Sequence, residues 1–178
     1  STPLGRDDLR DIDGIVMLAA GTSYYAAMVA RYWIEALARV PVSCEIASEY
    51  RYRKPVTGAF STAITISQSG ESLDTLMAMR HAGDAGLRTI GLVNVPESTI
   101  AREASLVMPT RAGPEIGVAS TKAFSAQCIT LTMLALKLAH ERGEMPKAEL
   151  KLKLAQMVEL PAKMRRMLET QPSQILQM

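Results

Sequence analysis

The stretch of sequence that decides the fold is residues 62–85, which read TAITISQSGESLDTLMAMRHAGDA. Residues 62–67 are a short, β-branched and largely apolar run, which is typical of a strand. A polar turn follows, and from Leu73 to Ala85 the apolar residues return at a spacing of three to four, which predicts a helix. Strand, turn and helix in this order form the repeating unit of a parallel sheet covered by helices.

Segments of the same kind lie on both sides of residues 62–85. The expected strands are 15–19, 42–47, 62–67, 89–93 and 105–109, and the expected helices are 24–38, 73–85, 96–103, 118–140 and 147–170. Crossovers between parallel strands are right-handed, so this series most simply folds into an α/β three-layer αβα sandwich with a five-stranded parallel sheet. Pro161 is expected to kink the last helix or to start a second one.

The pattern divides the chain into an N-terminal extension at 1–14, an α/β domain at 15–142 and a C-terminal helical segment at 147–178. Because the chain starts with Ser1 rather than methionine, we expect a piece of a longer protein. The apolar last helix and the methionine-rich tail predict self-association, and a homodimer is the expected state.

Composition excludes several classes of function. The 20 Lys and Arg against 18 Asp and Glu leave a formal net charge of +2, too balanced for a nucleic-acid-binding surface. No apolar run reaches the roughly 18 to 20 residues that a membrane-spanning helix needs, so we expect no membrane association and a cytoplasmic location. Cys44, Cys128 and the two histidines are too scattered for a disulfide framework or a zinc site. We expect no metal and no cofactor.

Three polar clusters, at 21–23, 67–72 and 117–122, follow predicted strands or open predicted helices. Ligands of open parallel sheets lie at the carboxyl ends of the strands, so these clusters are candidate sites. The second cluster places hydroxyls and an amide at a helix start, where unpaired N–H groups and the helix dipole favour an anion. The candidate phosphate-binding residues are Ser67, Gln68, Ser69 and Ser72. The alternative is that Ser69 or Ser72 only caps the helix.

Other chemistries have weaker support. The chain lacks the GxxxxGK[ST], GxGxxG and GxSxG patterns of nucleotide, dinucleotide and serine-hydrolase sites. His81 and His140 lie in predicted helices, which favours packing or surface roles. The remaining acid–base candidates are Glu49, Glu71 and Glu115, although a loop carboxylate is by default solvated or paired. The basic run at 50–54 is better explained as a solvated loop or a subunit contact than as a phosphate site.

Six short motifs in order resemble one known family. They are AGTS at 20–23, ARYWIE at 30–35, EIASEYRYR at 45–53, SQSGE at 67–71, NVP at 94–96 and GVASTKAF at 117–124. From about Ile15 to His140 the chain resembles the sugar isomerase (SIS) domain of the glucosamine-6-phosphate synthase family, and in particular its first SIS half. The resemblance implies a flavodoxin-like sheet and a phosphosugar ligand.

The resemblance also implies a function for the longer protein. Members of the family convert fructose 6-phosphate and glutamine into glucosamine 6-phosphate and glutamate. They carry an N-terminal glutaminase domain and two SIS halves, so the implied partners of this chain are a glutaminase domain and a second SIS half. By motif position, the phosphate would be held by Ser67, Gln68, Ser69 and Ser72, and the sugar would be lined by Thr22, Ser23, Val118, Ala119 and Ser120.

The same resemblance places the catalytic groups outside this chain. In the family, the glutamate base, the imine-forming lysine and a histidine belong to the second SIS half, so no catalytic residue is assigned here. Isomerisation requires a positioned base, whereas phosphate binding supplies only remote binding energy. The isolated chain is therefore expected to bind a hexose 6-phosphate without turnover. Ala20 stands where the family usually has cysteine, and Ser72 where it more often has threonine.

Two alternative functions remain open at this point. One is a stand-alone phosphosugar isomerase that completes its site across a homodimer, with Glu49 or Glu115 as the base. The other is a noncatalytic phosphosugar sensor, although residues 1–14 are too short for the helix-turn-helix that precedes the SIS domain in such regulators.

Overall fold

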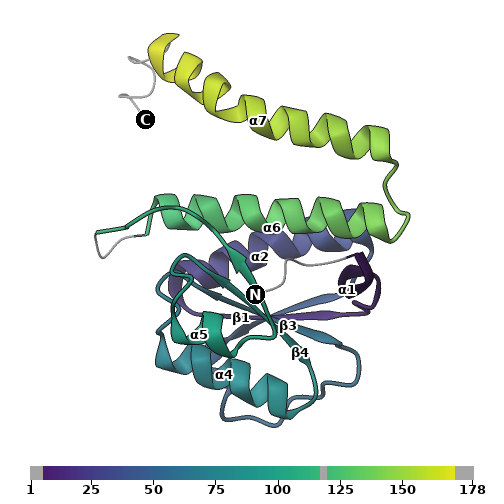
Figure 1. Ribbon diagram of the computed structural model, residues 1–178, viewed down its shortest axis with the longest axis vertical. Coiled ribbons are helices and arrows are strands. Elements are labelled where there is room, and N and C mark those ends of the chain that lie inside the picture. The colour runs from purple at the N-terminus through teal and green to yellow at the C-terminus, as the bar shows by residue number, and fades with distance from the viewer. Residues whose placement is uncertain (1–5, 117–119, 171–178) are drawn as a thin grey trace.

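A computed structural model describes residues 6–116 and 120–170 and shows a five-stranded sheet (Figure 1). The strands are β1 (Ile15–Ala19), β2 (Val42–Ile46), β3 (Thr62–Ser67), β4 (Arg88–Val93) and β5 (Leu106–Pro109). All neighbouring strands are parallel, in the order β2-β1-β3-β4-β5. The predicted five-stranded parallel sheet is confirmed, with strand ends shifted by one residue at most.

Helices cover both faces of the sheet. They are α1 (Arg6–Arg10), α2 (Gly21–Ala38), α3 (Ala47–Tyr50), α4 (Leu73–Asp84), α5 (Thr99–Glu103), α6 (Lys122–Glu141) and α7 (Lys147–Thr170). One core packs α1, α2 and α6 against the sheet, and two smaller cores pack α3, α4 and α5 against the opposite face. The three-layer αβα sandwich is therefore confirmed, and α7 lies outside it, against α6 (Figure 1).

The strands are apolar because both faces of the sheet are buried. In β3, Ile64 and Ile66 belong to the core under α2 and α6, whereas Ala63 belongs to the core under α4. All six residues of this strand are buried. A continuous apolar run without polar alternation is the pattern of a parallel strand covered on both sides.

Several elements differ from the sequence prediction. Helix α2 begins at Gly21, three residues early, because the positive φ of 56° at Gly21 turns the chain directly from β1 into the helix. Helix α7 continues through Pro161 as one helix. Proline has no N–H to bond the carbonyl one turn earlier in the helix. Because this helix is exposed, water can donate a hydrogen bond to that carbonyl instead. Helix α6 begins at Lys122 rather than at 118.

The strand order places two loops side by side. Ala19, at the end of β1, pairs with Ile66 near the end of β3. The next helices, α2 and α4, then leave towards opposite faces of the sheet. In an open α/β sheet such a change of direction marks where ligands bind, at the carboxyl ends of the two strands. The segments 20–23 and 67–72 begin at the ends of these two neighbouring strands. Among the described residues, no helix combines the length and apolar character needed to cross a membrane.

Candidate functional site

The turn between β3 and α4 is held together by its own serines. The hydroxyl oxygen of Ser67 accepts a hydrogen bond from the N–H of Gly70 at 3.0 Å. The hydroxyl oxygen of Ser69 accepts one from the N–H of Glu71 at 3.2 Å. Ser67 is buried, while Gln68, Ser69 and Ser72 are partly exposed. The four predicted phosphate-binding residues thus lie in one compact turn at the carboxyl edge of the sheet.

Gly70 lets this turn approach the neighbouring loop closely. Its φ of +68° lies in the left-handed region that favours glycine. A Cβ at this position would lie 2.0 Å from the Ser98 hydroxyl oxygen and 2.5 Å from the Ser98 Cβ. Glycine is therefore required here for two reasons, the backbone conformation and the contact with Ser98.

The loop between β4 and α5 supports the turn from behind. The N–H of Asn94 donates to the carbonyl of Gln68, and the N–H of Ile100 donates to the carbonyl of Gly70, both at 3.1 Å. The N–H of Thr99 donates to Glu71 Oε1 at 2.8 Å. This bond lowers the pKa of Glu71 below its usual value. The Glu71 carboxylate is thereby directed towards α5.

Asn94 also connects the turn to the loop that follows β5. Its side-chain amide donates to the carbonyl of Gly113 at 2.8 Å, and its amide oxygen accepts from the N–H of Ala112 at 2.8 Å and from the Thr110 hydroxyl at 3.1 Å. One residue that follows β4 therefore links the serine turn to the loop at 110–113. We did not predict this role from the residues themselves, because an isolated Asn in a loop has no distinctive sequence signal.

Helix α4 begins beside these serines with an uncapped first turn. Ser72 occupies the N-cap position, yet its side chain makes no capping hydrogen bond; its hydroxyl oxygen accepts from the Thr75 hydroxyl at 3.0 Å. The first N–H groups of a helix have no carbonyl within the helix to bond, and they form the positive end of the helix dipole. The 12-residue α4 thus presents backbone donors next to the serine turn.

The basic run at 50–54 is largely neutralised. Arg51 Nη1 lies 2.6 Å from Asp74 Oδ1, in the first turn of α4, and Arg53 Nη2 lies 2.7 Å from Glu45 Oε1. Both guanidinium groups therefore have carboxylate partners within the fold.

The predicted sugar-lining residues are in different environments. Thr22 is exposed at the start of α2, next to the serine turn. Ser23 is buried between α2 and α6, where its hydroxyl oxygen accepts from Gln127 Nε2 at 3.0 Å. Ser120 donates to Glu115 Oε2 at 3.4 Å in the loop that leads into α6. Val118 and Ala119 lie outside the described residues.

The carboxylate of Glu115 caps helix α6. Its Oε1 accepts from the N–H of Thr121 at 3.0 Å and from the N–H of Ala123 at 3.3 Å. These bonds, that of Thr121 first, lower the pKa of Glu115. A carboxylate held as an anion by helix N–H groups is a weak proton acceptor, and this argues against Glu115 as a base. Glu49 is exposed on α3 and is bonded at 3.5 Å by the hydroxyl of Ser48.

The two histidines bond backbone carbonyls away from the serine turn. His81 Nε2 lies 3.1 Å from the carbonyl of Arg53, and His140 Nδ1 lies 2.9 Å from the carbonyl of Met145. Within residues 6–116 and 120–170, no three His, Cys, Asp or Glu side chains gather as a metal site requires.

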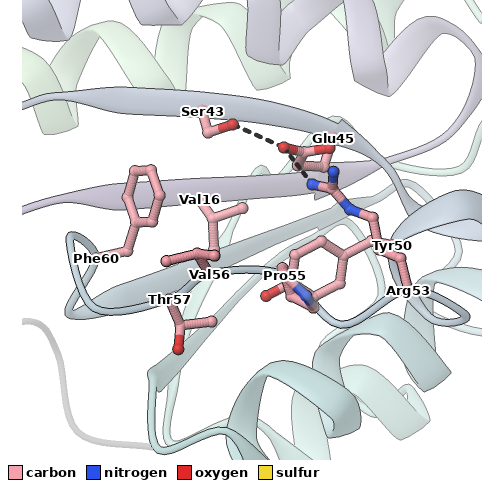
Figure 2. A pocket seen from close by; sticks show the side chains of 9 residues that line it. All are labelled: Val16, Ser43, Glu45, Tyr50, Arg53, Pro55, Val56, Thr57 and Phe60. Carbon is pink, nitrogen blue, oxygen red and sulfur yellow. Dashed lines mark hydrogen bonds and ion pairs between the residues drawn. The ribbon is translucent and has the colours of Figure 1, made fainter.

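A separate cavity of about 300 Å³ lies between β2, α3 and the loop that follows α3 (Figure 2). Its lining includes none of the predicted site residues. Its polar groups are mostly bonded to one another, because Ser43 donates to Glu45 Oε1 at 2.8 Å and Arg53 pairs with the same oxygen. The Tyr50 hydroxyl points into the cavity and is buried without a hydrogen-bond partner among the described residues. The candidate site is therefore the open edge at the serine turn, not this cavity.

An α/β domain with a five-stranded parallel sheet is the class of protein that this fold defines. The family profile of the SIS domain matches residues 8–137, and the chain belongs to the SIS domain family. It is 53% identical over 155 residues to the glutamine–fructose-6-phosphate aminotransferase (isomerising) of Zymomonas mobilis, and 49% identical over 154 residues to one from Bradyrhizobium diazoefficiens.

A solved structure agrees with these relatives. The C-terminal domain of glucosamine-fructose-6-phosphate aminotransferase from Francisella tularensis superposes with a TM-score of 0.85 at 39% identity, over 88% of this chain and 44% of that domain. The two aminotransferase relatives match 87% and 86% of this chain. The chain spans only 26% and 25% of the length of those relatives.

Proposed function

We propose that this chain is the first SIS half of an isomerising glutamine–fructose-6-phosphate aminotransferase, and that it binds the phosphate of a hexose 6-phosphate at the serine turn. One observation supports the phosphate site above the others. All three serines of the turn act as hydrogen-bond acceptors within the protein, from Gly70, Glu71 and Thr75. Because a hydroxyl has one proton to donate, that proton stays available for a phosphate oxygen in each case.

The backbone and the amide complete the proposed phosphate site. The free N–H groups at the start of α4 add donors without adding a full positive charge. Gln68 contributes its side-chain amide, while its carbonyl is occupied by Asn94. A phosphate in this position would lie at the carboxyl ends of β1 and β3, where the strand order favours a ligand.

The sugar would extend from the phosphate towards the ends of β1 and β5. We assign this part of the site to Thr22, Ser23, Val118, Ala119 and Ser120. Thr22 adjoins the turn through the pairing of β1 with β3. Ser23 accepts from Gln127 and so keeps its own proton to donate, although its burial limits the approach to small groups.

This half supplies binding, and we assign the chemistry to the missing half. Three described carboxylates at this edge are already bonded, Glu71 by Thr99, Asp74 by Arg51 and Glu115 by the start of α6. Moving a proton between C1 and C2 of a sugar needs a free base in position. The isolated chain should bind a hexose 6-phosphate no more tightly than about −5 kcal/mol, which corresponds to high micromolar dissociation constants, and should not isomerise it.

The partners proposed for the full-length protein are a glutaminase domain and a second SIS half. An apolar groove of about 350 Å³ lies between α6 and α7, and its lining includes Met133, Val158 and Met164. The chain covers 44% of the Francisella C-terminal domain, which leaves room there for a second domain of similar size. We assign the groove to that second half. In the isolated chain, a second copy is expected to cover it and form a homodimer.

A titration followed by NMR tests the proposed phosphate site. Fructose 6-phosphate should shift the amide signals of residues 67–75, and unphosphorylated fructose should not. Ser69→Ala combined with Ser72→Ala removes two proposed donors and should weaken binding at least tenfold. Ser105→Ala is the matched control, because Ser105 lies before β5 at the opposite edge of the sheet.

Two outcomes would count against this proposal. Shifts confined to the cavity beside Tyr50 would place the ligand elsewhere. Steady isomerisation of fructose 6-phosphate by the purified chain, rising with the dimer fraction, would instead favour a stand-alone dimeric isomerase.

A further inference from the structure

Two acidic residues adjoin the proposed phosphate site. Glu71 lies within the serine turn, and Asp74 lies in the first turn of α4. Acidic side chains in a first helical turn stabilise the helix through its dipole. A phosphate monoester at the same helix end would be repelled by these charges, so the site must offset them in order to bind a dianion.

The two carboxylates have different bonding partners. Glu71 is bonded to the N–H of Thr99 and directed towards α5. Asp74 is half-exposed and meets a full positive charge, because Arg51 Nη1 lies 2.6 Å from Asp74 Oδ1. Arg51 belongs to the segment that follows α3, 23 residues earlier in the chain.

Arg51 is held in position rather than extended into solvent. Its side chain is only 19% exposed, and its guanidinium lies 4.6 Å from the centre of the Tyr52 ring. The neighbouring Arg53 is 51% exposed and pairs with Glu45 at the cavity instead. Two arginines two residues apart therefore serve two different carboxylates, and only Arg51 reaches the helix that starts at the serine turn.

We propose that Arg51 is a specificity-determining residue of the phosphate site, which neutralises Asp74 and so allows the start of α4 to accept a phosphate monoester dianion. This inference rests on the proposed function, since it concerns the same turn. It predicts that Arg51 affects the binding of phosphorylated sugars and has no effect on uncharged ones. The partners are partly solvated, so the effect should be several-fold and should decrease with added salt.

Two substitutions break the same ion pair and have opposite electrostatic consequences. Arg51→Gln leaves the charge of Asp74 unopposed, and it should weaken binding of fructose 6-phosphate about 3- to 10-fold at low salt. Asp74→Asn removes the repelling charge, and binding should be as tight as in the wild type or tighter. The double variant should return to within about twofold of the wild type.

The directions of these changes distinguish charge from structure. If the ion pair only holds the loop in place, Arg51→Gln and Asp74→Asn will weaken binding alike, and the inference is wrong. It is also wrong if Arg51→Gln binds as the wild type does. Arg53→Gln is the matched control, since it removes an arginine from the same loop and leaves Asp74 paired; its affinity should not change.

The wild-type titration separates this inference from the proposed function. If fructose 6-phosphate does not shift residues 67–75 of the wild-type chain, the phosphate site itself is wrong. If it does, the variants test Arg51 alone. Thermal unfolding of each variant, measured beside the titration, shows whether the fold is retained, and repeating the titrations at 50 mM and 500 mM salt should reduce the Arg51→Gln defect.

Discussion

The α/β body, residues 6–145, and helix α7 differ in how they cover their apolar side chains. The body buries residues such as Ile64, Leu92 and Leu131 completely. Helix α7 buries no residue, and it leaves Val158 81% and Leu152 59% exposed. The body therefore stabilises the serine turn by itself, whereas α7 leaves an apolar surface exposed. The proposed phosphate site thus lies on the well-packed part of the chain, and the surface proposed for a partner lies on the exposed part.

The largest effect on stability should come from shortening a leucine in the core of the body. The same change at a leucine of α7 should have almost no effect. Leu131→Ala leaves a cavity between α6 and the sheet and should lower the free energy of unfolding by about 2–5 kcal/mol. Leu152→Ala on α7 should change it by less than about 0.5 kcal/mol in the monomer. Urea denaturation at low protein concentration measures both. A similar loss in the two variants would show that α7 is part of the folded core.

The next effect concerns the tight packing of the body at the serine turn. Gly70→Ala combines a positive φ with a clash against Ser98, and it should cost about 2–4 kcal/mol in unfolding free energy. Gly86→Ala is the control, because Gly86 has a φ of +88° with open space around it. That variant should lose only about 1 kcal/mol. Equal losses would mean that the contact with Ser98 does not constrain the turn.

Much of the body was predictable from the sequence, because its signals are local. Runs such as 62–67 are apolar, β-branched and bounded by turns, so each strand was found within one residue of its observed ends. The helices α1 and α3 were missed, since five and four residues are too few to show a helical period. The serines of the turn were chosen for the same local reason, as they follow a strand and precede a helix.

The parts of the site that escaped prediction depend on contacts between distant segments. Thr99 is 28 residues from Glu71, and Arg51 is 23 residues from Asp74. The strand order places β4 beside β3, and the fold packs α3 beside α4. These two neighbours bring the distant partners together. The burial of Ser23 against Gln127, 104 residues away, is a consequence of the same kind. Local patterns show which residues have useful chemistry, and the topology decides which partners they meet.

A charge on α7 should test whether its exposed apolar surface forms the proposed homodimer. Val158 lines the groove between α6 and α7 and is exposed. Val158→Glu should raise the dissociation constant of the proposed homodimer at least tenfold, about 1.4 kcal/mol, without changing the unfolding free energy of the monomer. Analytical ultracentrifugation over a range of concentrations measures this. Lys151→Glu is the control, as it changes a charge at an exposed α7 position outside the groove. A wild-type chain that stays monomeric at all concentrations would contradict the proposed homodimer.

The smallest effect should be a change of stability with pH at the edge strand of the body. Cys44 lies in β2 and packs against the main core, and burial raises the pKa of its thiol from 9.0 to about 11. The folded chain therefore keeps this proton at pH values where the unfolded chain has lost it. The free energy of unfolding should fall as the pH rises from about 9 to 11, by about 1 kcal/mol once partial solvation is considered. Cys44→Ala should remove this slope, and the wild-type thiol should react slowly with a thiol reagent at pH 8. If the slope persists in Cys44→Ala, other groups cause it. Rapid labelling of the wild-type thiol would show that β2 opens readily at the edge of the sheet.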